Sequence, residues 1–339
     1  MSEECLFIRA DMNSEISTGH VMRCLSIADA AARMGKKAAF ITADDSPKEL
    51  IESRGHRCIV LGTNWNDLQG ELPALEKVIA SEKADRLLVD HYSVTEEYLK
   101  RLNGLTQVYY LDDLKAFDYP VSAVICYAVY GEDYYTDKDH KKKYFLGCEY
   151  APLREAFEHP HPKMINDRIG NILIMTGGSD PYGIAEGVLG SLALDEYVSV
   201  NVICGRYSGM KERLTELFGD RENVHIYPFV ENVWELYDEA DVAISAGGST
   251  LYELASMGVP VITYSFADNQ IPNVSSFDKK GLMPCAGDAR KDDIHAGIIK
   301  HLDEMRPPEV RKCISGRLMK LVDGKGAERL AHALLDIGK

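Results

Sequence analysis

A histidine stands directly before a helix-like apolar pattern in the segment DMNSEISTGHVMRCLSIADA (11–30). Gly19 and His20 form the mouth of this predicted helix. A helix N-terminus carries partial positive charge, which disfavours imidazolium, and Arg23 acts in the same direction. A neutral imidazole is a good general base near pH 7, so His20 is the candidate catalytic residue. Asp11 could bond the other ring nitrogen and select its tautomer. The alternative is a histidine that only caps or fills the rim.

Two glycine turns predict an anion site. TGGSDPYG and SAGGSTLYE each join an apolar run to Gly-Gly, Ser and a helix. Glycine lets a ligand approach the backbone, and a helix N-terminus favours an anion. One such turn alone is better explained by a tight turn with a Ser cap. Two in one half of the chain favour phosphate, although neither is a dinucleotide or Walker A motif and no cofactor is predicted. The candidate contacts are Gly177, Gly178, Ser179, Gly247, Gly248, Ser249 and Thr250.

Three further polar residues have two interpretations each. Glu253 follows Thr250 by three residues, so it could complete a capping box or accept hydrogen bonds from a ribose diol. Asn269 and Gln270 precede a predicted helix, which they could cap. Their amides could also bond sugar hydroxyls and acetamido groups, but from these residues alone the cap is the better interpretation.

Other polar stretches also end predicted strands. VDHYS (89–93) and LDD (111–113) bring aspartates to the strand ends, but no metal-ligand spacing is present, so loop-capping carboxylates are expected and no metal is predicted. The Tyr-rich stretch 126–135 could line a sugar site or be a loop with buried rings. The basic run HKKKY (140–144) is interpreted as a solvated turn.

The elements that position these residues alternate between strands and helices. Several strands are nearly continuous apolar runs, as parallel sheets covered on both faces require. A Pro-rich and charge-rich stretch, 158–170, predicts a linker between an N-terminal domain (1–157) and a C-terminal domain (171–339). The tail has two helices broken at 323–326, which could pack back on the first domain. The predicted strands are 5–10, 38–43, 57–62, 86–91, 107–113, 122–127, 171–178, 198–205, 223–229, 241–248 and 259–265.

This pattern predicts two doubly wound α/β domains, with a ligand at the carboxyl ends of their strands. The net charge of -15 disfavours nucleic acid as a partner. No apolar run is long enough for a membrane span, and the start lacks the layout of a signal peptide. Eight scattered cysteines without paired spacing are expected to be reduced thiols. We therefore expect a cytoplasmic protein that binds a small molecule.

The chain resembles the UDP-sugar hydrolases of pseudaminic acid biosynthesis, the PseG family, in six segments. These are RADMNSEISTGHVMRCLSIADA, LLVDHYS, YLDD, GCEYAPLREAF, TGGSD and SAGGSTLYELASMGVPVITYSFADNQ. The matches run in order from about residue 8 to 270. The family hydrolyses UDP-2,4-diacetamido-2,4,6-trideoxy-β-L-altropyranose and is related to MurG-type N-acetylglucosaminyltransferases. The resemblance implies a GT-B fold, with two Rossmann-like domains facing an interdomain cleft.

The resemblance also implies a role for each candidate. His20 would activate water, the glycine turns would hold the diphosphate of UDP, and Glu253 would bond the ribose. The uracil would meet the main chain near Phe229 and Val230. One departure is STGH, where Ser17 replaces a glycine of the family pattern, a change that could alter the shape of the loop at Ser17 and Thr18. The other expected substrate contacts are Asp11, Gly19, Arg23, Tyr92, Asn269 and Gln270.

The expected reaction is hydrolysis of the UDP-sugar at its anomeric carbon, with inversion. A MurG-like transferase would use the same residues with an acceptor hydroxyl in place of water. A hydrolase for a legionaminic-type UDP-sugar and a non-catalytic nucleotide-sugar-binding protein are further alternatives.

Overall fold

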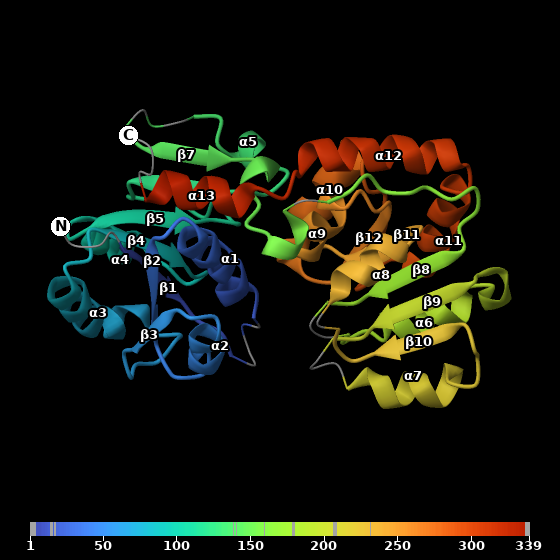
Figure 1. The fold of residues 1–339 in the computed structure, drawn as a ribbon, viewed down its shortest axis with the longest axis horizontal. Coiled ribbons are helices and arrows are strands. Elements are labelled where there is room, and N and C mark those ends of the chain that lie inside the picture. The colour runs from blue at the N-terminus through green and yellow to red at the C-terminus, as the bar shows by residue number, and fades with distance from the viewer. Residues whose placement is uncertain are drawn as a thin grey trace. The chain divides into compact units, whose positions relative to one another are not determined.

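The computed structural model describes residues 5–335, apart from positions 14, 15, 17, 138, 140, 159, 178, 179, 206–208 and 231. The chain divides into two compact units, each of which is an α/β domain (Figure 1). Unit 1 is Met1–Glu155 with Gly324–Lys339, and unit 2 is Ala156–Asp323. None of the helices described is long and apolar enough to cross a membrane.

Unit 1 contains a seven-stranded parallel sheet in the order β3-β2-β1-β4-β5-β6-β7. The chain order reverses between β1 and β4. Loops leaving such a switch point diverge, and ligands of doubly wound sheets bind there. The strands are β1 (Cys5–Ala10), β2 (Lys37–Thr42), β3 (Arg57–Val60), β4 (Arg86–Asp90), β5 (Gln107–Leu111), β6 (Ala123–Cys126) and β7 (Lys143–Leu146).

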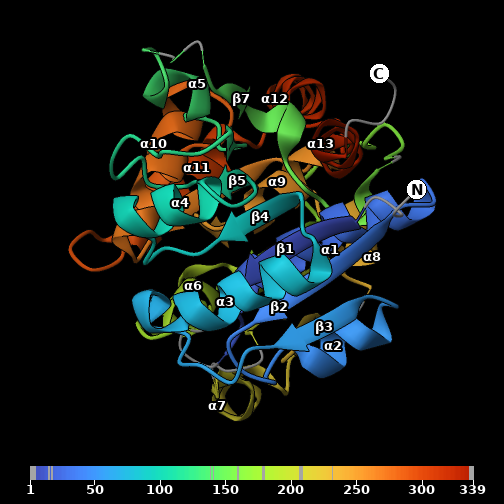
Figure 2. The same cartoon turned by 90° about the vertical axis from the view of Figure 1, so that its left-hand side faces the viewer.

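Helices cover both faces of this sheet, which is why its strands are apolar along their length. The chain crosses the sheet in one direction through α1 and in the other through α3, so right-handed crossovers place these helices on opposite faces. Figure 2 shows α3 and α4 on the near face, and α13 packs against α1. The helices are α1 (Gly19–Arg33), α2 (Lys48–Ser53), α3 (Leu68–Glu82), α4 (Glu96–Asn103), α5 (Gly131–Tyr134) and α13 (Gly326–Leu334).

The strands predicted for this half of the chain all occur, with ends shifted by one or two residues. The sequence does not predict β7. Our interpretation of HKKKY as a solvated turn is wrong at its end, because Lys143 and Tyr144 lie in β7 and pair with Ala123 and Val124. The mixture of lysines with only two aromatic residues hides this short edge strand.

Unit 2 repeats the same strand order, β10-β9-β8-β11-β12-β13, with its switch point between β8 and β11. The sequence misses only β13, a short Gly-containing edge strand. The strands are β8 (Asn171–Met175), β9 (Ser199–Ile203), β10 (Val224–Tyr227), β11 (Val242–Ala246), β12 (Val261–Ser265) and β13 (Cys285–Asp288). The helices are α6 (Ile184–Ser191), α7 (Met210–Phe218), α8 (Val233–Glu239), α9 (Thr250–Ser256), α10 (Ile271–Lys279), α11 (Ile294–Glu304) and α12 (Pro308–Leu321).

The predicted linker 158–170 has no helix or strand among its described residues, but hydrogen bonds hold it to unit 2. Asp241 accepts from the side-chain amide of Asn166 at 2.8 Å and from the backbone N–H of Gly170 at 2.7 Å. The fully buried Arg311 of α12 donates to the carbonyl of Asn166 at 2.8 Å. These bonds satisfy the polar backbone of an irregular segment.

The last helix, α13, belongs to unit 1. A Cβ on Gly326 would lie 2.2 Å from the carbonyl oxygen of Ala151, so only glycine allows this approach. Arg86, the first residue of β4, donates to the carbonyl of Leu334 at 3.0 Å. Unit 1 is therefore built from two stretches that lie far apart in the sequence.

Candidate active site

His20 lies in the first turn of α1, one residue after the helix begins at Gly19. The helix forms because Val21, Leu25 and Ala28 present a buried apolar stripe. The preceding loop leaves the carboxyl end of β1, so His20 lies at the switch point of the unit 1 sheet. Its side chain is largely buried, with 7% of the residue exposed. The structure thus places His20 where the sequence predicts it.

Asp90, the last residue of β4, orients the His20 ring. The Nδ1 atom of His20 and Oδ1 of Asp90 are 2.6 Å apart. An ionised carboxylate only accepts hydrogen bonds, so Nδ1 carries the hydrogen and Nε2 of the neutral ring keeps its lone pair. Nε2 has no hydrogen-bond partner among the residues that the structure describes. This is the tautomer that a general base needs.

Arg23 holds Asp90 in its ionised form. Its Nε and Nη2 atoms each donate to one oxygen of Asp90, both at 2.6 Å. Burial alone would raise the pKa of Asp90, but the guanidinium of Arg23, with His20, lowers the pKa well below its ordinary value. Nη2 also approaches Nδ1 of His20 at 3.3 Å, which is a contact between two N–H groups rather than a hydrogen bond. Asp90 therefore stays an acceptor for His20 throughout the neutral pH range.

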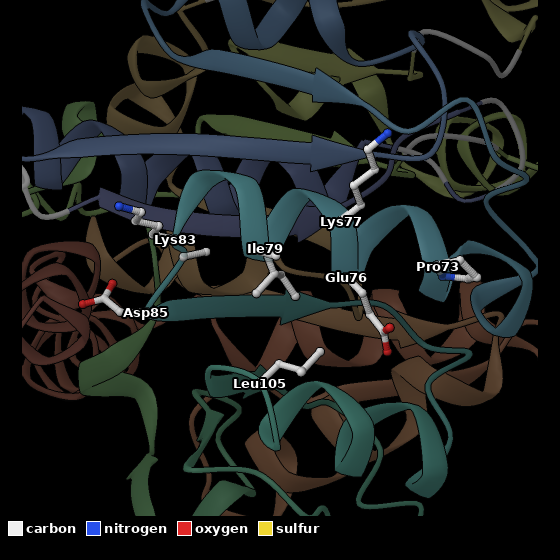
Figure 3. A pocket seen from close by; sticks show the side chains of 9 residues that line it. Pro73, Glu76, Lys77, Ile79, Lys83, Asp85 and Leu105 are labelled. Atoms are coloured by element: carbon white, nitrogen blue, oxygen red, sulfur yellow. The ribbon is translucent and has the colours of Figure 1, made fainter.

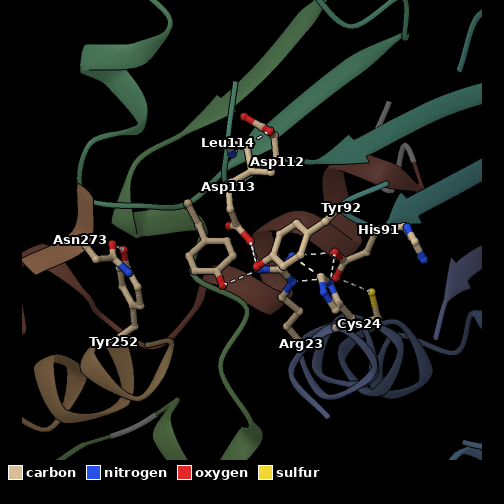
Figure 4. A network of polar contacts seen from close by, with 12 residues as sticks. Arg23, Cys24, His91, Tyr92, Asp112, Asp113, Leu114, Tyr252 and Asn273 are labelled. Carbon is tan, nitrogen blue, oxygen red and sulfur yellow. Dashed lines mark hydrogen bonds and ion pairs between the residues drawn. The ribbon is translucent and has the colours of Figure 1, made fainter. Parts of the chain in front are cut away.

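A second carboxylate continues this network towards Tyr92 (Figure 4). Arg23 Nη1 donates to Asp113 Oδ2 at 2.7 Å and to the hydroxyl of Tyr127 at 3.0 Å. The Tyr92 hydroxyl donates to the same oxygen of Asp113 at 3.0 Å. The Tyr92 ring meets that of His20 edge-on, with centroids 4.5 Å apart. Burial raises the pKa of Tyr92, with a further contribution from Asp113, so the phenol stays protonated and able to donate. Tyr92 thereby limits the movement of the histidine ring.

The prediction that Asp11 bonds a ring nitrogen of His20 is wrong. Its Oδ1 atom accepts from the backbone N–H of Ala43 at 2.8 Å, and its Oδ2 atom lies 2.6 Å from Nη1 of Arg9. The second contact is an ion pair whose angle does not meet hydrogen-bond geometry. Arg9 also binds the buried Glu71 of α3, with 2.9 Å between Nε and Oε1. Asp11 therefore helps to hold β1, β2 and α3 together.

His91, next to Asp90, uses both ring nitrogens within the fold. Its Nδ1 atom accepts from the backbone N–H of Ser93 at 3.0 Å, and Nε2 lies 3.1 Å from the carbonyl of Trp65. Burial, with a contribution from Arg9, lowers the pKa of His91 and keeps the ring neutral. His91 is thus a structural residue.

The expectation of loop-capping carboxylates is confirmed for Asp112. It accepts from the hydroxyls of Tyr119 and Tyr135, each at 2.6 Å, and from the backbone N–H of Lys115. The rings of Tyr127, Tyr130 and Tyr135 are buried, as one of the two interpretations of the Tyr-rich stretch expects, although the stretch also contains the short helix α5. Within the described ranges, no His, Cys, Asp and Glu side chains form a group of three that could hold a metal ion.

The first glycine turn of unit 2 follows β8. Gly177 has a φ of +84°, a backbone conformation that favours glycine, and no atom would lie within 4 Å of an added Cβ. Gly178 and Ser179 lie outside the described residues. Asp180 accepts from the backbone N–H groups of Ile184 and Ala185, at 2.8 and 2.9 Å, and so fixes the loop to the start of α6.

The second glycine turn follows β11, and its two glycines differ in how closely other residues pack against them. A Cβ on Gly247 would lie 2.5 Å from Cγ1 of Val274, so packing explains this residue. Gly248 has open space on that side. The capping box, one of the two interpretations of Glu253, is absent, because the N-cap residue of α9 is Ser249 and its side chain makes no capping hydrogen bond. Thr250 is the first residue of the helix.

Glu253 lies in α9, after the second glycine turn, and the remaining candidates follow other strands of the same sheet. Glu253 accepts from the hydroxyl of Tyr237 at 3.1 Å. Phe229, just after β10, is 54% exposed, and Val230 is half-buried. Asn269 is exposed in the turn after β12. Gln270 does not cap α10 through its side chain, whose Oε1 accepts from the backbone N–H of Phe266 at 3.0 Å.

The structure therefore assembles two separate sets of residues, one in each unit. In unit 1, His20, Arg23 and Tyr92 lie in one network of contacts. Asp90 and Asp113 complete this network; the sequence places both at strand ends but predicts no role for them in the site. In unit 2, the two glycine turns leave β8 and β11, so they meet at the switch point. Phe229 and Asn269 follow β10 and β12, which lie on either side of it.

The hollow in Figure 3 is a different feature of unit 1. It has a volume of about 710 Å³ and lies beside α3 and the amino end of β4. Ligands of doubly wound sheets bind at the carboxyl ends of the strands, so this hollow is not our candidate site. Its lining residues are Pro73, Glu76, Lys77, Ile79, Ala80, Lys83, Ala84, Asp85 and Leu105.

Comparison with known proteins identifies the class of the fold. Residues 172–312 match the Glycosyltransferase family 28 C-terminal domain. MurG of Acinetobacter baumannii has a similar structure, with a TM-score of 0.71 and 13% identity over 98% of this chain and 100% of that chain. UGT71G1 of Medicago truncatula, solved with UDP-glucose, gives a TM-score of 0.67 and 13% identity over 98% of both chains. The protein is thus glycosyltransferase-like and has the predicted GT-B fold.

The family 28 match lies within unit 2. Three curated proteins are similar to this chain over longer stretches than that match. MJ1062, an uncharacterized protein of Methanocaldococcus jannaschii, is 27% identical over 75% of this chain and 54% of its own length. SpsG of Bacillus subtilis, a spore coat polysaccharide biosynthesis protein, is 25% identical over 97% of both chains. The third, from Helicobacter pylori, is 24% identical over 78% of this chain and 45% of its own length. Its name is pseudaminic acid cytidylyltransferase and UDP-2,4-diacetamido-2,4,6-trideoxy-β-L-altropyranose hydrolase.

Proposed function

We propose that this protein is an enzyme that hydrolyses a UDP-linked diacetamido-trideoxy sugar at its anomeric carbon, releasing UDP and the free sugar. The observation that carries the proposal is the pair formed by His20 and Asp90 at a switch point, with the lone pair on Nε2. A base held in this tautomer fits a reaction that must remove a proton from a nucleophile. The name of the Helicobacter pylori relative supports the choice of reaction and sugar.

In the proposed complex, unit 2 binds the nucleotide. The glycine turns after β8 and β11 would take the diphosphate, Glu253 the ribose, and the main chain at Phe229 and Val230 the uracil. Asn269 and Gln270 would contact the sugar. In unit 1, Gly19 and Tyr92 are the proposed sugar contacts. Arg23 orients Asp90 and Asp11 holds the fold, so neither is proposed to touch the substrate. The match of unit 2 to the family 28 domain supports this assignment.

The proposed reaction has one step. Nε2 of His20 removes a proton from water as its oxygen attacks the anomeric carbon, and the C–O bond to the diphosphate breaks. The electron pair of that bond leaves with UDP, and the anomeric centre is inverted. Asp90 stabilises the imidazolium that forms, because its carboxylate already accepts the hydrogen on Nδ1. Backbone N–H groups of the glycine turns would stabilise the charge on the departing diphosphate.

Replacement of His20 by Asn tests the proposal. Turnover should fall roughly a hundredfold or more, the usual contribution of a general base, while UDP affinity stays nearly the same. His301→Asn is a matched control, because Nδ1 of His301 also meets a carboxylate, that of Glu304, at 2.7 Å in unit 2. Unchanged turnover of His20→Asn would remove His20 from the mechanism. Hydrolysis in ¹⁸O-labelled water should place the label in the sugar, whereas label in UDP would show attack at phosphorus.

A transferase is the second candidate, and the similarity to glycosyltransferase structures favours it. Such an enzyme would use His20 to activate an acceptor hydroxyl in place of water. Incubation with UDP-sugar alone separates the two, because only a hydrolase releases free sugar rapidly without an acceptor. A panel that includes legionaminic-type UDP-sugars would establish the stereochemistry of the substrate.

A further inference from the structure

Two aromatic rings meet at the carboxyl edge of the unit 2 sheet, outside the residues assigned so far. Tyr182 lies in the loop after β8 and is 51% exposed. Phe266 directly follows β12 and is partly buried. Their ring centroids are 6.5 Å apart, within the range of a weak aromatic pair. An exposed ring at the edge where such sheets bind ligands has apolar surface available for a ligand.

The strand order places this pair around the second glycine turn. β11 lies between β8 and β12 in the sheet, so the rings come from the loops on either side of the turn at Gly247 and Gly248. Gly248 has open space where a side chain would stand. A group attached to a diphosphate at this turn would therefore lie next to Tyr182 and Phe266.

Hydrogen bonds and ion pairs among the described residues hold part of each loop that carries a ring. Asp180 holds the first through backbone N–H groups at the start of α6. In the second, Arg290 binds Asp268 at 2.7 Å and is itself held by both oxygens of Asp288, at 2.9 and 2.7 Å. The side chain of Gln270 closes the same loop on the N–H of Phe266.

We propose that Tyr182 and Phe266 form an apolar wall that binds the hexose of the nucleotide sugar through its methyl groups. The inference rests on the proposed function and deepens it. Acetamido methyls and a deoxy carbon can lie on an aromatic face without losing hydrogen bonds to water. A hydroxyl in the same place would be desolvated without a partner. The wall therefore selects sugars with acetamido and deoxy groups over hydroxylated sugars.

Calorimetry with unhydrolysed ligands tests the wall. In a His20→Asn parent, Tyr182→Ala should weaken binding of the UDP-diacetamido-trideoxy sugar about fivefold to tenfold, as expected for loss of one aromatic contact. Binding of UDP alone should change less than twofold, and binding of UDP-N-acetylglucosamine should change by an intermediate factor. Tyr182→Phe should keep the affinity of the parent. Leu217→Ala is the control, because Leu217 is a similarly exposed apolar residue of unit 2, on α7.

The outcomes separate this inference from the proposed function. If Tyr182→Ala weakens UDP and UDP-sugar equally, the ring contacts the nucleotide and the wall is refuted. Unchanged affinity for all three ligands also refutes it. A parent that fails to bind UDP overturns the proposed function and the wall together, whereas a parent that binds UDP but discriminates no sugar overturns the wall alone.

Discussion

The substitution Asp90→Asn separates the orientation of His20 from its presence. The carboxylate of Asp90 accepts from Nδ1 of His20 and from two nitrogens of Arg23, each at 2.6 Å. An amide has the same size but only one acceptor atom. If its oxygen faces His20, its NH2 group faces Nε of Arg23, and two donors meet. If the amide is turned round, NH2 faces Nδ1 and favours the tautomer with hydrogen on Nε2, which is not a base.

The size of both effects follows from this geometry. Loss of the correct tautomer should lower kcat by about 10²–10⁴-fold, the usual range for a general base. Breaking a buried ion pair costs about 3–5 kcal/mol of folding free energy. We expect a value near 3 kcal/mol, at the low end of that range, because Arg23 keeps its second carboxylate, Asp113, at 2.7 Å. KM should change less than kcat, since Asp90 is 1% exposed and cannot reach the substrate.

The assay is steady-state hydrolysis of the UDP-sugar, with urea denaturation of the same preparations. Asp241→Asn is the matched control, because Asp241 is a buried carboxylate of unit 2 that accepts three hydrogen bonds away from His20. It should lose stability and keep kcat. A kcat for Asp90→Asn within threefold of the wild type would refute our account of the histidine tautomer, and so would an equal loss of kcat in the control.

Three further predictions concern packing and pH. Gly326→Ala should lower the free energy of unfolding by about 1–3 kcal/mol, because its Cβ would overlap the backbone of Ala151; an unchanged Tm would contradict this. Gly247→Ala should destabilise unit 2 by a similar amount for the same reason, whereas Gly248→Ala should leave Tm nearly constant and weaken UDP binding in calorimetry. The pKa of Asp90 is lower in the folded protein than in the unfolded chain, where it is ~4. Its contribution to the free energy of unfolding should therefore be fully present above pH ~4 and be lost as the pH falls towards the pKa of the folded state. Urea denaturation from pH 6 to 3 should show this loss in the wild type, and a smaller loss in Asp90→Asn.

The central strands and the edge strands β3 and β10 could be predicted from the sequence, whereas the edge strands β7 and β13 could not. Central strands are buried on both faces, so β1 and β8 are nearly continuous apolar runs that differ clearly from the residues around them. β7 and β13 lie at sheet edges, where one row of backbone groups is unpaired and fewer side chains are buried. Their residues, KYFL and CAGD, lack a clear apolar pattern, whereas the edge strands β3 (RCIV) and β10 (VHIY) keep enough apolar residues to be predicted.

The position of His20 could also be predicted, but its partner could not. Asp11 is close to His20 along the chain, and this proximity made it the expected partner. Asp90 is 70 residues away, yet β4 lies beside β1 because the chain order reverses there. Knowledge of the strand order would have predicted Asp90, because the carboxyl ends of the two strands beside a switch point are neighbours.

In unit 2, the sequence predicted glycine turns but could not separate the two glycines of the second turn. Gly247 is explained by the approach of Val274, which belongs to α10 and comes from a later part of the chain. Such a contact depends on packing that no local pattern contains. Gly248 has no such neighbour among the described residues, so packing does not explain it. Its proposed role therefore remains the binding of the diphosphate.

Unit 1 consists of two stretches that lie far apart in the sequence, and this affects how the protein folds while the ribosome synthesises it. Unit 2 is one continuous stretch, Ala156–Asp323, and can fold as soon as it has emerged. Unit 1 is synthesised first but waits for Gly326–Leu334 before the surface of α1 is covered. A stop codon just before α13 would thus leave the half that carries His20 incomplete, although every residue of its sheet is present.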